Sequence, residues 1–436
     1  MPKTSSEGLV RGIRRWDLIA FTVNGIIGAG IFGLPAKIYS LIGSYSLIAF
    51  VACALIVMLI ILCFAEVGSR FEETGGPYLY AREAFGPTAA FEVGWLIWLA
   101  RLTAFAANCN LMVSYIGHFW PASTTMWWRA SIIAFVVAML ATINLIGVRQ
   151  AAIVSNFFTV GKLIPMLIFI VAGLFFLNPH AYTLGPRPAA GAFSQSVLLL
   201  IYAFTGFEMA AIPAGEAQNP RRNLPHSLLI AIAVVAVTYI LIQVVCVGTL
   251  PELAQSQRPL ADAGSRFLGT AGGAIISAGA IISMTGNLNI VLLSGSRVPF
   301  AMAERKQLPT VFARVNKRFA TPDVAIVGTA VLMLLLTLRQ SFVQALTISA
   351  IARLVAYAVT CAALPVLRRR RDAPPALFRL PGGTLISIAS LVLAGWLLAN
   401  STLREGLVAL IAAAFGFAVY LIHRLVTKSQ NGDRRL

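Results

Sequence analysis

Charged side chains are scarce in this chain. Only 11% of its 436 residues are Asp, Glu, Lys or Arg, whereas 58% are hydrophobic, and the mean hydropathy is +0.82. A soluble domain needs a much larger share of polar residues to cover its surface. The composition therefore excludes a soluble protein and predicts an all-α membrane protein that crosses the bilayer several times.

Residues that bind metals are also few. The four histidines are scattered over loops and helix ends, and the five cysteines all lie in apolar segments. Neither set has the spacing of a metal site or of a disulfide framework. The sequence therefore predicts no metal site, no cofactor and no catalytic residue, which argues against a membrane enzyme. The cysteines are expected to pack as small hydrophobic side chains.

Acidic residues are outnumbered by basic ones, 16 to 34, which gives a net charge of +18. The basic residues are concentrated in the segments that face the cytoplasm if the N-terminus is cytoplasmic, for example residues 305–318 and 368–371. This distribution follows the positive-inside rule. It predicts a multi-pass protein of the inner or plasma membrane whose basic loops contact anionic lipids, and it gives no reason to expect a nucleic-acid partner.

Windows of about 20 apolar residues predict twelve spanning helices. They cover residues 16–42, 46–68, 87–116, 128–146, 152–177, 194–218, 227–249, 269–296, 322–339, 342–366, 384–400 and 406–426. The first window is long enough to span and is not followed by a small-residue cleavage site. We therefore expect it to be retained as the first helix.

Two of the predicted helices contain a break. The first includes NGIIGAGIFGLP, residues 24–35, where glycines replace the usual helix formers, and the sixth includes YAFTGFE, residues 202–208. Irregular backbone inside a bilayer persists only where it is buried in protein or lines a water-filled cavity. We expect breaks at residues 27–30 and 203–206, with a binding site between them.

The broken helices are five positions apart, so the second has the opposite orientation to the first. Such a pair is typical of an inverted-topology repeat. The predicted divisions are a cytoplasmic tail (1–15), two five-helix repeats (16–177 and 194–366), helices 11 and 12 (384–426) and a second cytoplasmic tail (427–436). Helices 11 and 12 would pack on the periphery or at a dimer contact, so a monomer and a homodimer both remain possible.

Four motifs resemble those of the amino acid, polyamine and organocation (APC) superfamily of transporters, and the likeness covers nearly the whole chain. They are GIIGAGIFGLP in the first helix, GGPY at residues 75–78, GFEMAAIPAGEAQNPRRNLP at residues 206–225, and SGSRVPFAMAERKQLP at residues 294–309. The resemblance implies a LeuT-type fold and amino acid transport by alternating access.

The ends of two half-helices suit a zwitterion, because one end offers free N–H groups and the other free carbonyls. Members of this superfamily bind the substrate backbone in this way. We expect the α-carboxylate to bind the N–H groups of Gly28, Ala29 and Gly30. We expect the α-ammonium to face the carbonyls of Ile26, Tyr202 and Thr205. The alternative is that the glycines only permit close helix packing.

Lys162 is an isolated cation in the middle of the fifth predicted helix, where insertion of a lysine costs about 3 kcal/mol. In proton-coupled relatives a lysine on this helix takes the place of a sodium ion, and Lys162 matches it. The alternative is a permanently charged tether to carbonyls of helix 1 or 8. Polar residues of helix 8 are candidates for a sodium site, for bonds to Lys162, or for ordinary interhelical bonds: Ser277, Ser283, Thr285, Asn287 and Asn289.

Glu208 follows the second break, where a carboxylate needs a partner or a proton. It is a candidate proton-sensing group, a gate latch, or the ion-pair partner of Arg101. Glu216, at the inner end of the sixth helix, is expected to form a gate salt bridge.

Arg101 and Arg353 have no place in the superfamily's general substrate motif. An interior ion pair or snorkelling towards an interface would account for each, whereas an arginine that reached the cavity would favour a substrate with an extra acidic group. Phe105 is expected to line the side-chain pocket together with Tyr202. Since no acidic residue lies in the breaks to select a cationic side chain, we expect neutral substrates.

Taken together, these expectations predict a secondary active transporter of amino acids that is coupled to protons through Lys162. A proton-independent exchanger and a sodium symporter remain alternatives within transport. A membrane sensor or receptor for amino acids is the alternative from another class, although the sequence shows no soluble output domain.

Overall fold

The computed structural model describes residues 14–73, 75–146, 148–212, 214, 217–316, 318–319 and 321–432; side chains are described except at residues 148–160 and 423–432. Within these ranges every regular element is a helix. The first seven α-helices are α1 (Arg15–Ile26), α2 (Ala29–Ile42), α3 (Ser46–Gly68), α4 (Pro77–Phe85), α5 (Pro87–Ile116), α6 (Met126–Ile146) and α7 (Val148–Gly173). The others are α8 (Ala192–Phe204), α9 (Pro220–Thr249), α10 (Pro259–Glu304), α11 (Asp323–Arg339), α12 (Phe342–Arg369), α13 (Gly383–Ala399) and α14 (Leu403–Gly432).

The helices are long and apolar enough to form a multi-pass membrane protein. In the described part of the chain, eight helical stretches could cross a membrane by length and composition, and two apolar helices are shorter. The bounds of α3 and α5 coincide with the predicted windows 46–68 and 87–116. The prediction of an all-α membrane protein is confirmed, while the count of twelve spans and the inverted repeat stay predictions.

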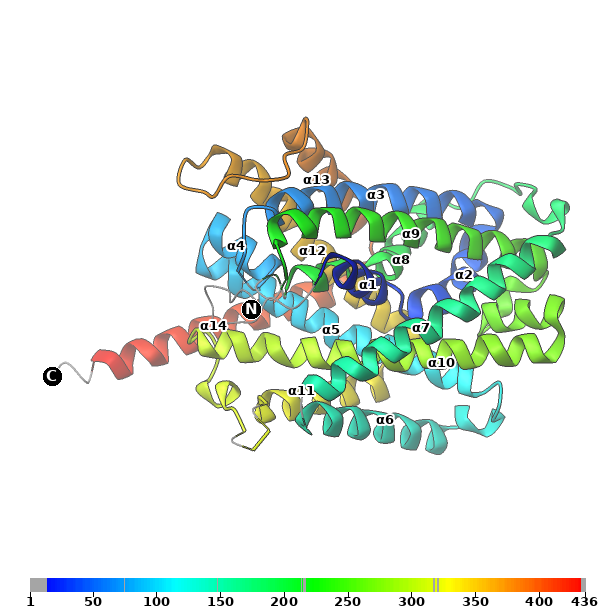
Figure 1. Cartoon of the computed structure of the whole chain (residues 1–436), viewed down its shortest axis with the longest axis horizontal. Coiled ribbons are helices and arrows are strands. Elements are labelled where there is room, and N and C mark those ends of the chain that lie inside the picture. The colour runs from blue at the N-terminus through cyan, green and yellow to red at the C-terminus, as the bar shows by residue number, and fades with distance from the viewer. Residues whose placement is uncertain are drawn as a thin grey trace.

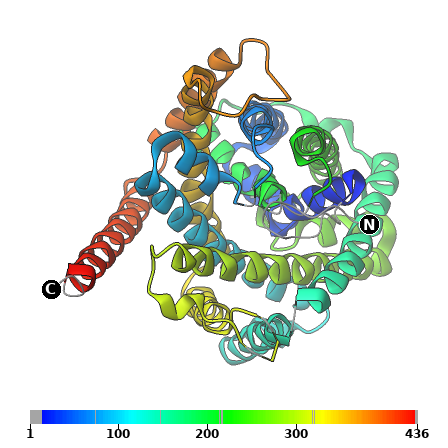
Figure 2. The ribbon, with the colours of Figure 1, turned by 60° about the vertical axis from the view of Figure 1, so that its left-hand side comes forward.

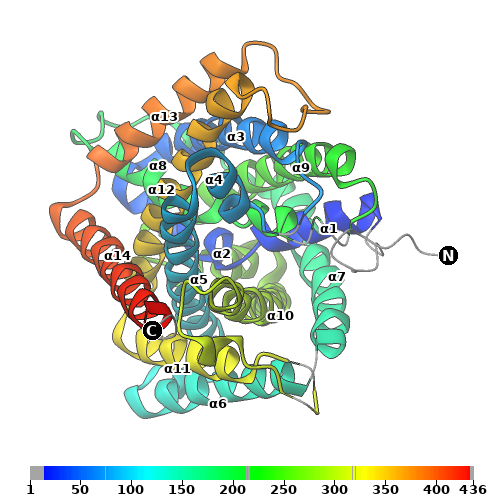
Figure 3. The ribbon, with the colours of Figure 1, turned by 90° about the vertical axis from the view of Figure 1, so that its left-hand side faces the viewer.

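The first break lies inside the bundle. Seen along the bundle, α2 is in the middle, with α3, α5, α9, α10 and α12 around it, and α1 runs outwards between α9 and α7, whereas α6, α11, α13 and α14 lie on the outside (Figure 3). Burial agrees with this arrangement, because 89% of the most apolar window of α5 is buried but only 6% of that of α14. The C-terminal end of α14 projects beyond the other helices (Figures 1 and 2), whereas its earlier turns contact α5, where Trp95 Nε1 donates to the carbonyl of Ala412 at 2.9 Å.

One long helix is interrupted near its start. Within α10, Gly269 has φ +67° and ψ −168°, which is not helical backbone. Glycine adopts a positive φ without the steric penalty of other residues. The predicted span 269–296 begins at this residue, so the spanning part of α10 follows the kink.

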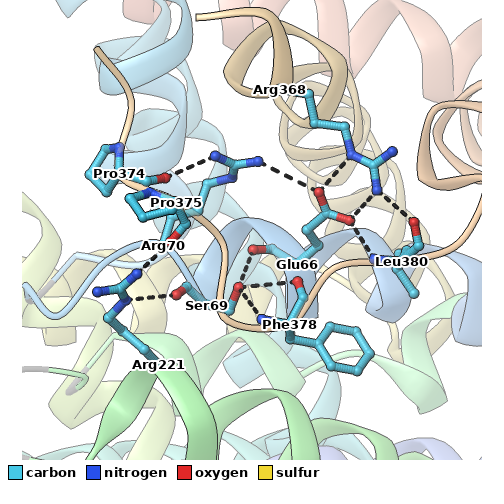
Figure 4. A network of polar contacts seen from close by, with 9 residues as sticks. All are labelled: Glu66, Ser69, Arg70, Arg221, Arg368, Pro374, Pro375, Phe378 and Leu380. Carbon is cyan, nitrogen blue, oxygen red and sulfur yellow. Dashed lines mark hydrogen bonds and ion pairs between the residues drawn. The ribbon is translucent and has the colours of Figure 1, made fainter. Parts of the chain in front are cut away.

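At the end of the molecule that carries α4, the buried carboxylate of Glu66 joins three parts of the chain. Glu66, near the end of α3, is fully buried, and its two oxygens accept hydrogen bonds from Arg368 Nε at 2.7 Å and Nη2 at 2.6 Å. The backbone N–H of Leu380 donates to the same carboxylate at 2.8 Å, and Arg70 lies 3.6 Å away. Glu66 thereby joins α3 to α12 and to the segment that follows α12 (Figure 4).

The same segment is held at further points along its length. The N–H of Phe378 donates to Ser69 Oγ at 3.1 Å, and Arg70 Nη1 donates to the carbonyl of Pro374 at 2.9 Å. Arg221, at the start of α9, donates from Nε to the carbonyl of Ser69 at 3.0 Å. Residues 374–380 are therefore bound along the end of α3, with α9 attached to the same point (Figure 4).

Candidate functional site

The first helix breaks where its glycines predict it. α1 ends at Ile26 and α2 begins at Ala29, so Ile27 (φ −74°, ψ +95°) and Gly28 (φ −127°, ψ −150°) lie outside both helices. The predicted break at residues 27–30 is confirmed and is shorter than expected, because α2 already includes Ala29 and Gly30. The N–H groups of the first turn of α2 have no partners inside the helix.

The second break follows α8. Thr205 is extended, and Gly206 has a φ of +112° before the 3₁₀ helix η5 (Phe207–Ala211) begins. The side chain of Glu208 stabilises this turn, since its Oε2 accepts a hydrogen bond from the N–H of Gly206 at 2.9 Å. The break predicted at residues 203–206 is confirmed at Thr205 and Gly206, whereas Ala203 and Phe204 still belong to α8.

The two breaks touch each other through their backbones. A Cβ atom on Gly206 would overlap the carbonyl of Gly25, and a Cβ atom on Gly30 would lie 2.6 Å from Cα of Ala203. Only glycine permits such approach. These glycines thus allow close helix packing, which is the alternative role considered for the motif, and the binding role stays a prediction.

A small cavity of about 20 Å³ lies between the breaks. Six predicted site residues line it: Ile26, Gly28, Ala29, Gly30, Tyr202 and Thr205. The other lining residues are Gly25, Ala104, Asn108, Met209, Asn287, Val291 and Arg353. Such a volume holds about one water molecule. The site is closed in this structure, and an amino acid enters only if the surrounding helices move apart.

Asn108 on α5 closes the cavity, and sequence reasoning missed it. Its Oδ1 accepts the N–H of Ala29 at 2.9 Å, while its Nδ2 donates to the hydroxyl of Tyr202 at 2.8 Å and to the carbonyl of Ala104 at 2.8 Å. It therefore holds one N–H predicted to bind a carboxylate. An asparagine in the middle of an apolar helix is the signal that could have identified it.

Phe105 does not line the cavity in this structure, and its expected place in a side-chain pocket stays a prediction. Phe105 is fully buried but is not among the lining residues, whereas Ala104 and Asn108 are.

Two of the three carbonyls expected to face an ammonium group already accept hydrogen bonds. The carbonyl of Ile26 accepts one from the hydroxyl of Tyr239 at 3.3 Å, and that of Tyr202 accepts two from Thr205, from Oγ1 at 2.8 Å and from the backbone N–H at 3.3 Å. A carbonyl has two lone pairs, so that of Ile26 can accept a second bond, whereas that of Tyr202 would have to give one up. The role of the three carbonyls stays a prediction.

Lys162 lies against the first break. Its Nζ donates to the carbonyls of Asn24 at 3.1 Å and Ile27 at 2.9 Å, and its side chain is buried. Among the described residues, no carboxylate forms an ion pair with it. Lys162 therefore binds the backbone at the end of α1. Within the described part of the chain, it makes no hydrogen bond to α10, which contains the eighth predicted span. Both roles considered for it, proton coupling and a permanent tether, are compatible with this geometry.

The ion-pair partner expected for Glu208 is wrong. Glu208 Oε1 accepts a hydrogen bond from Arg353 Nη1 at 2.9 Å, and its Oε2 accepts one from the hydroxyl of Tyr357 at 2.5 Å. Arg101 instead donates from Nη1 to the hydroxyl of Ser294. The interior ion pair considered for Arg353 is thus confirmed, and it links the second break to α12. Glu216 lies outside the described residues.

A larger hollow is unrelated to the breaks. It has a volume of about 850 Å³ and lies where the end of α5 meets the start of α10, with Arg258 and Asp262 among its lining residues. It shares no lining residue with the central cavity. In addition, no group of three or more His, Cys, Asp or Glu residues in the described ranges could hold a metal ion.

Comparison with known families gives one match over most of the chain. The profile of the family described as "Amino acid permease" matches residues 13–420. The chain belongs to the amino acid permease family. The resemblance to the APC superfamily is confirmed by this match.

The permease is similar to characterised transporters. It is 29% identical to the Serine/threonine exchanger SteT of Bacillus subtilis, covering 96% of this chain and 98% of that protein. It is 27% identical to the Branched-chain amino acid permease BcaP of Bacillus subtilis, over 91% of this chain and 90% of that protein. It is 29% identical to the mouse Cationic amino acid transporter 4, over 84% of this chain and 61% of that protein. These relatives are transporters and not enzymes.

Two of the four motifs that carry the resemblance form the breaks of the permease. The motif of the first helix supplies the end of α1 and the start of α2, and the segment from residue 206 supplies η5 with Glu208. The GGPY motif leads into α4, whose first two residues are its Pro77 and Tyr78, and the fourth motif includes the end of α10. The most glycine-rich of these motifs therefore surrounds the cavity.

Proposed function

We propose that this permease carries amino acids across the membrane by alternating access, with the substrate bound between the two helix breaks. The observation that carries the proposal is the contact of two interrupted helices around a cavity lined by Gly28, Ala29 and Thr205. Discontinuous helices that face one another inside a membrane place dipole ends where they can bind a charged substrate.

The backbone of the substrate would replace contacts that the protein makes with itself. The α-carboxylate would take the N–H groups of Gly28, Ala29 and Gly30, and Asn108 would then release the N–H of Ala29. The α-ammonium would bind the carbonyls of Ile26, Tyr202 and Thr205; that of Ile26 has a lone pair available, whereas that of Tyr202 would exchange its bond from Thr205 Oγ1 for one from the ammonium group. Because the cavity holds about one water molecule, binding requires α5 to separate from the breaks.

Proton coupling through Lys162 is the mechanism that we favour. Its ammonium group bridges two carbonyls at the end of α1, so loss of the proton weakens the attachment of α1 to α7. A protonation step would thereby change the position of the first break. Glu208 is a second candidate for such a step, since it binds the second break directly through Gly206.

One observation favours a proton-independent exchanger as the second candidate. Lys162 has two good acceptors and so could stay permanently charged as a tether. The relative SteT is named a serine/threonine exchanger. A sodium symporter and an amino acid sensor are further alternatives. The positive-inside distribution supports an inner or plasma membrane location with a cytoplasmic N-terminus.

Transport by purified protein in vesicles tests the proposal. Vesicles preloaded with an unlabelled amino acid should accumulate the labelled one by counter-flow, and an imposed pH gradient should drive net uptake without sodium. Candidate substrates come from a thermal-shift screen of all amino acids, because a ligand stabilises the state that binds it. Binding without any counter-flow would instead support a sensor, and net uptake only with sodium would support a symporter of that ion.

A further inference from the structure

Arg101 is a buried cation whose hydrogen-bonding capacity is mostly unused. It lies in the middle of α5 and is fully buried. Nη1 donates to the hydroxyl of Ser294, but Nε and Nη2 have no partner among the described residues. Arginine stays charged in proteins, and a buried charge without a counter-charge strongly destabilises the fold. The unused side of this guanidinium therefore requires an explanation.

The unused atoms form one edge of the guanidinium. Nε–H and one N–H of Nη2 point the same way and are spaced to match the two oxygens of a carboxylate. The hydroxyl of Ser294 holds the opposite corner through Nη1 and so fixes the orientation of the group. Ser294 itself is oriented by a bond from its hydroxyl to the carbonyl of Ile290 at 2.8 Å. The free edge thus has the shape that binds a bidentate anionic group, and it becomes accessible only when the surrounding helices separate.

Arg101 lies one helical turn from the central cavity. Ala104 lines the cavity from α5, and Arg101 precedes it by three residues. Val291 lines the cavity from α10, and Ser294 follows it by three residues. The N-terminus of α5 and the C-terminus of α10 lie at the same end of the molecule, the end that carries α4. Arg101 and Ser294 are therefore both displaced from the cavity towards that end. Three residues of helix rise by about 4.5 Å, which is within reach of an aspartate or glutamate side chain.

Among the residues that the structure describes, no acidic side chain forms an ion pair with Arg101. Glu208 is the acidic group that acts on it electrostatically, but both oxygens of Glu208 are engaged by Arg353, Tyr357 and Gly206. Arg353 lines the cavity and has an unpartnered Nε of its own. Two buried arginines and one buried glutamate leave an excess of one positive charge beside the site.

We infer that Arg101, assisted by Arg353, forms a subsite for an anionic group, and that the permease therefore accepts amino acids with a second carboxylate. This inference rests on the proposed function, since it places the backbone of the same substrate between the breaks. It replaces the expectation of neutral substrates, which considered only the residues of the breaks. A free small anion such as chloride has the same chemistry and is the other possible source of the charge.

Ligand binding to purified protein distinguishes these sources. Melting temperatures are measured with glutamate, aspartate, glutamine and asparagine, first in a chloride-free gluconate buffer and then with chloride. The acidic amino acids should bind at least about tenfold more tightly than their amides, as a charge-assisted bidentate contact predicts. Arg101→Met should remove this difference and leave the affinity for the amides within about twofold.

Two further variants keep the test decisive. Ser294→Ala retains the charge of Arg101, so it should keep most of the preference for acidic amino acids. Arg129→Met is the control: Arg129 is bound to Asn110 and does not line the cavity, so this variant should keep the whole preference. Arg101→Met without ligand should melt no lower than the wild type, because it deletes an uncompensated charge. If the Met variant does not fold, competition of acidic against neutral amino acids in the wild-type protein gives the same answer.

Each outcome has a separate meaning. Acidic amino acids that neither bind nor compete, in a protein that carries neutral ones, would overturn this inference and leave the proposed function intact. Stabilisation by chloride that depends on Arg101, without a preference for acidic amino acids, would show a free-anion site and also overturn it. A protein that carries no amino acid in counter-flow would contradict the proposed function itself.

Discussion

Replacement of Glu208 by glutamine should destabilise the permease strongly, and removal of Arg353 at the same time should restore much of the loss. Glu208 and Arg353 are 1% and 4% exposed, and their side chains meet at 2.9 Å. Removing one partner of a buried ion pair leaves an uncompensated charge and costs about 3–5 kcal/mol. Glutamine can still accept the N–H of Gly206, so the expected loss reports chiefly on the charge of Arg353.

The double variant separates the charge from the packing. Glu208→Gln with Arg353→Met removes both charges and keeps most of the volume, and replacement of a whole buried pair is often close to neutral. We expect it to recover at least about 2 kcal/mol of the single-variant loss. Arg353→Met alone should also be unstable, because Glu208 then keeps only Tyr357 and Gly206 as donors.

Thermal unfolding of the protein in detergent, followed by tryptophan fluorescence, measures these effects. Each kcal/mol corresponds to about 2 °C or less in a chain of this length, so Glu208→Gln should melt roughly 5 °C below the wild type. Losses of the two single variants that simply add in the double variant would refute the reasoning, since independent sites add and a coupled ion pair does not.

Three further predictions concern the breaks and the α4 end. Lys162→Ala should abolish uptake driven by a pH gradient while ligand binding, measured by thermal shift, persists; undiminished proton-driven uptake would rule out its coupling role. Gly206→Ala should abolish counter-flow and lower the free energy of unfolding by more than about 2 kcal/mol. The new methyl group clashes with the carbonyl of Gly25, and alanine is strained at a positive φ. The matched control is Gly382→Ala, because Gly382 also has a positive φ (+62°) but has open space where the new methyl group would lie. It should lower the free energy of unfolding by about 1 kcal/mol, measured by denaturation in detergent. Glu66→Gln should lower the free energy of unfolding by about 3 kcal/mol in the same measurement, because Glu66 is fully buried. Asp262→Asn is the control: its ion pair with Arg258 is about one third exposed, so the loss should be less than about 1 kcal/mol. Equal losses would contradict the role given to burial.

The helices and their breaks could be predicted from the sequence because the bilayer imposes them. An apolar run such as residues 46–68 must satisfy its backbone internally, so its length fixes both ends of α3. Glycines at positions 25, 28 and 30 in such a run are equally informative, since a continuous helix there has no need of them. Both breaks were found at the predicted positions for this reason.

The partners of the charged residues could not be predicted in the same way. Which arginine meets Glu208 depends on the rotation and depth of α5 and α12, and on the left-handed turn at Gly206 that aims the carboxylate. The sequence places Arg101 and Arg353 at similar depth and does not choose between them. The rotation of α5 also decides that Asn108, and not Phe105, faces the breaks. Such rotations follow from packing between helices that are far apart in the sequence.

The binding of residues 374–380 along α3 determines which parts of the permease can move separately. Glu66 and Ser69 attach this segment to α3 at two points, and Arg221 brings the start of α9 to the same place. Sliding of α12 past α3 would separate the buried Glu66 carboxylate from the Arg368 guanidinium that donates to both of its oxygens. Any widening of the cavity towards this end must therefore carry α3, α12 and residues 374–380 together as one unit.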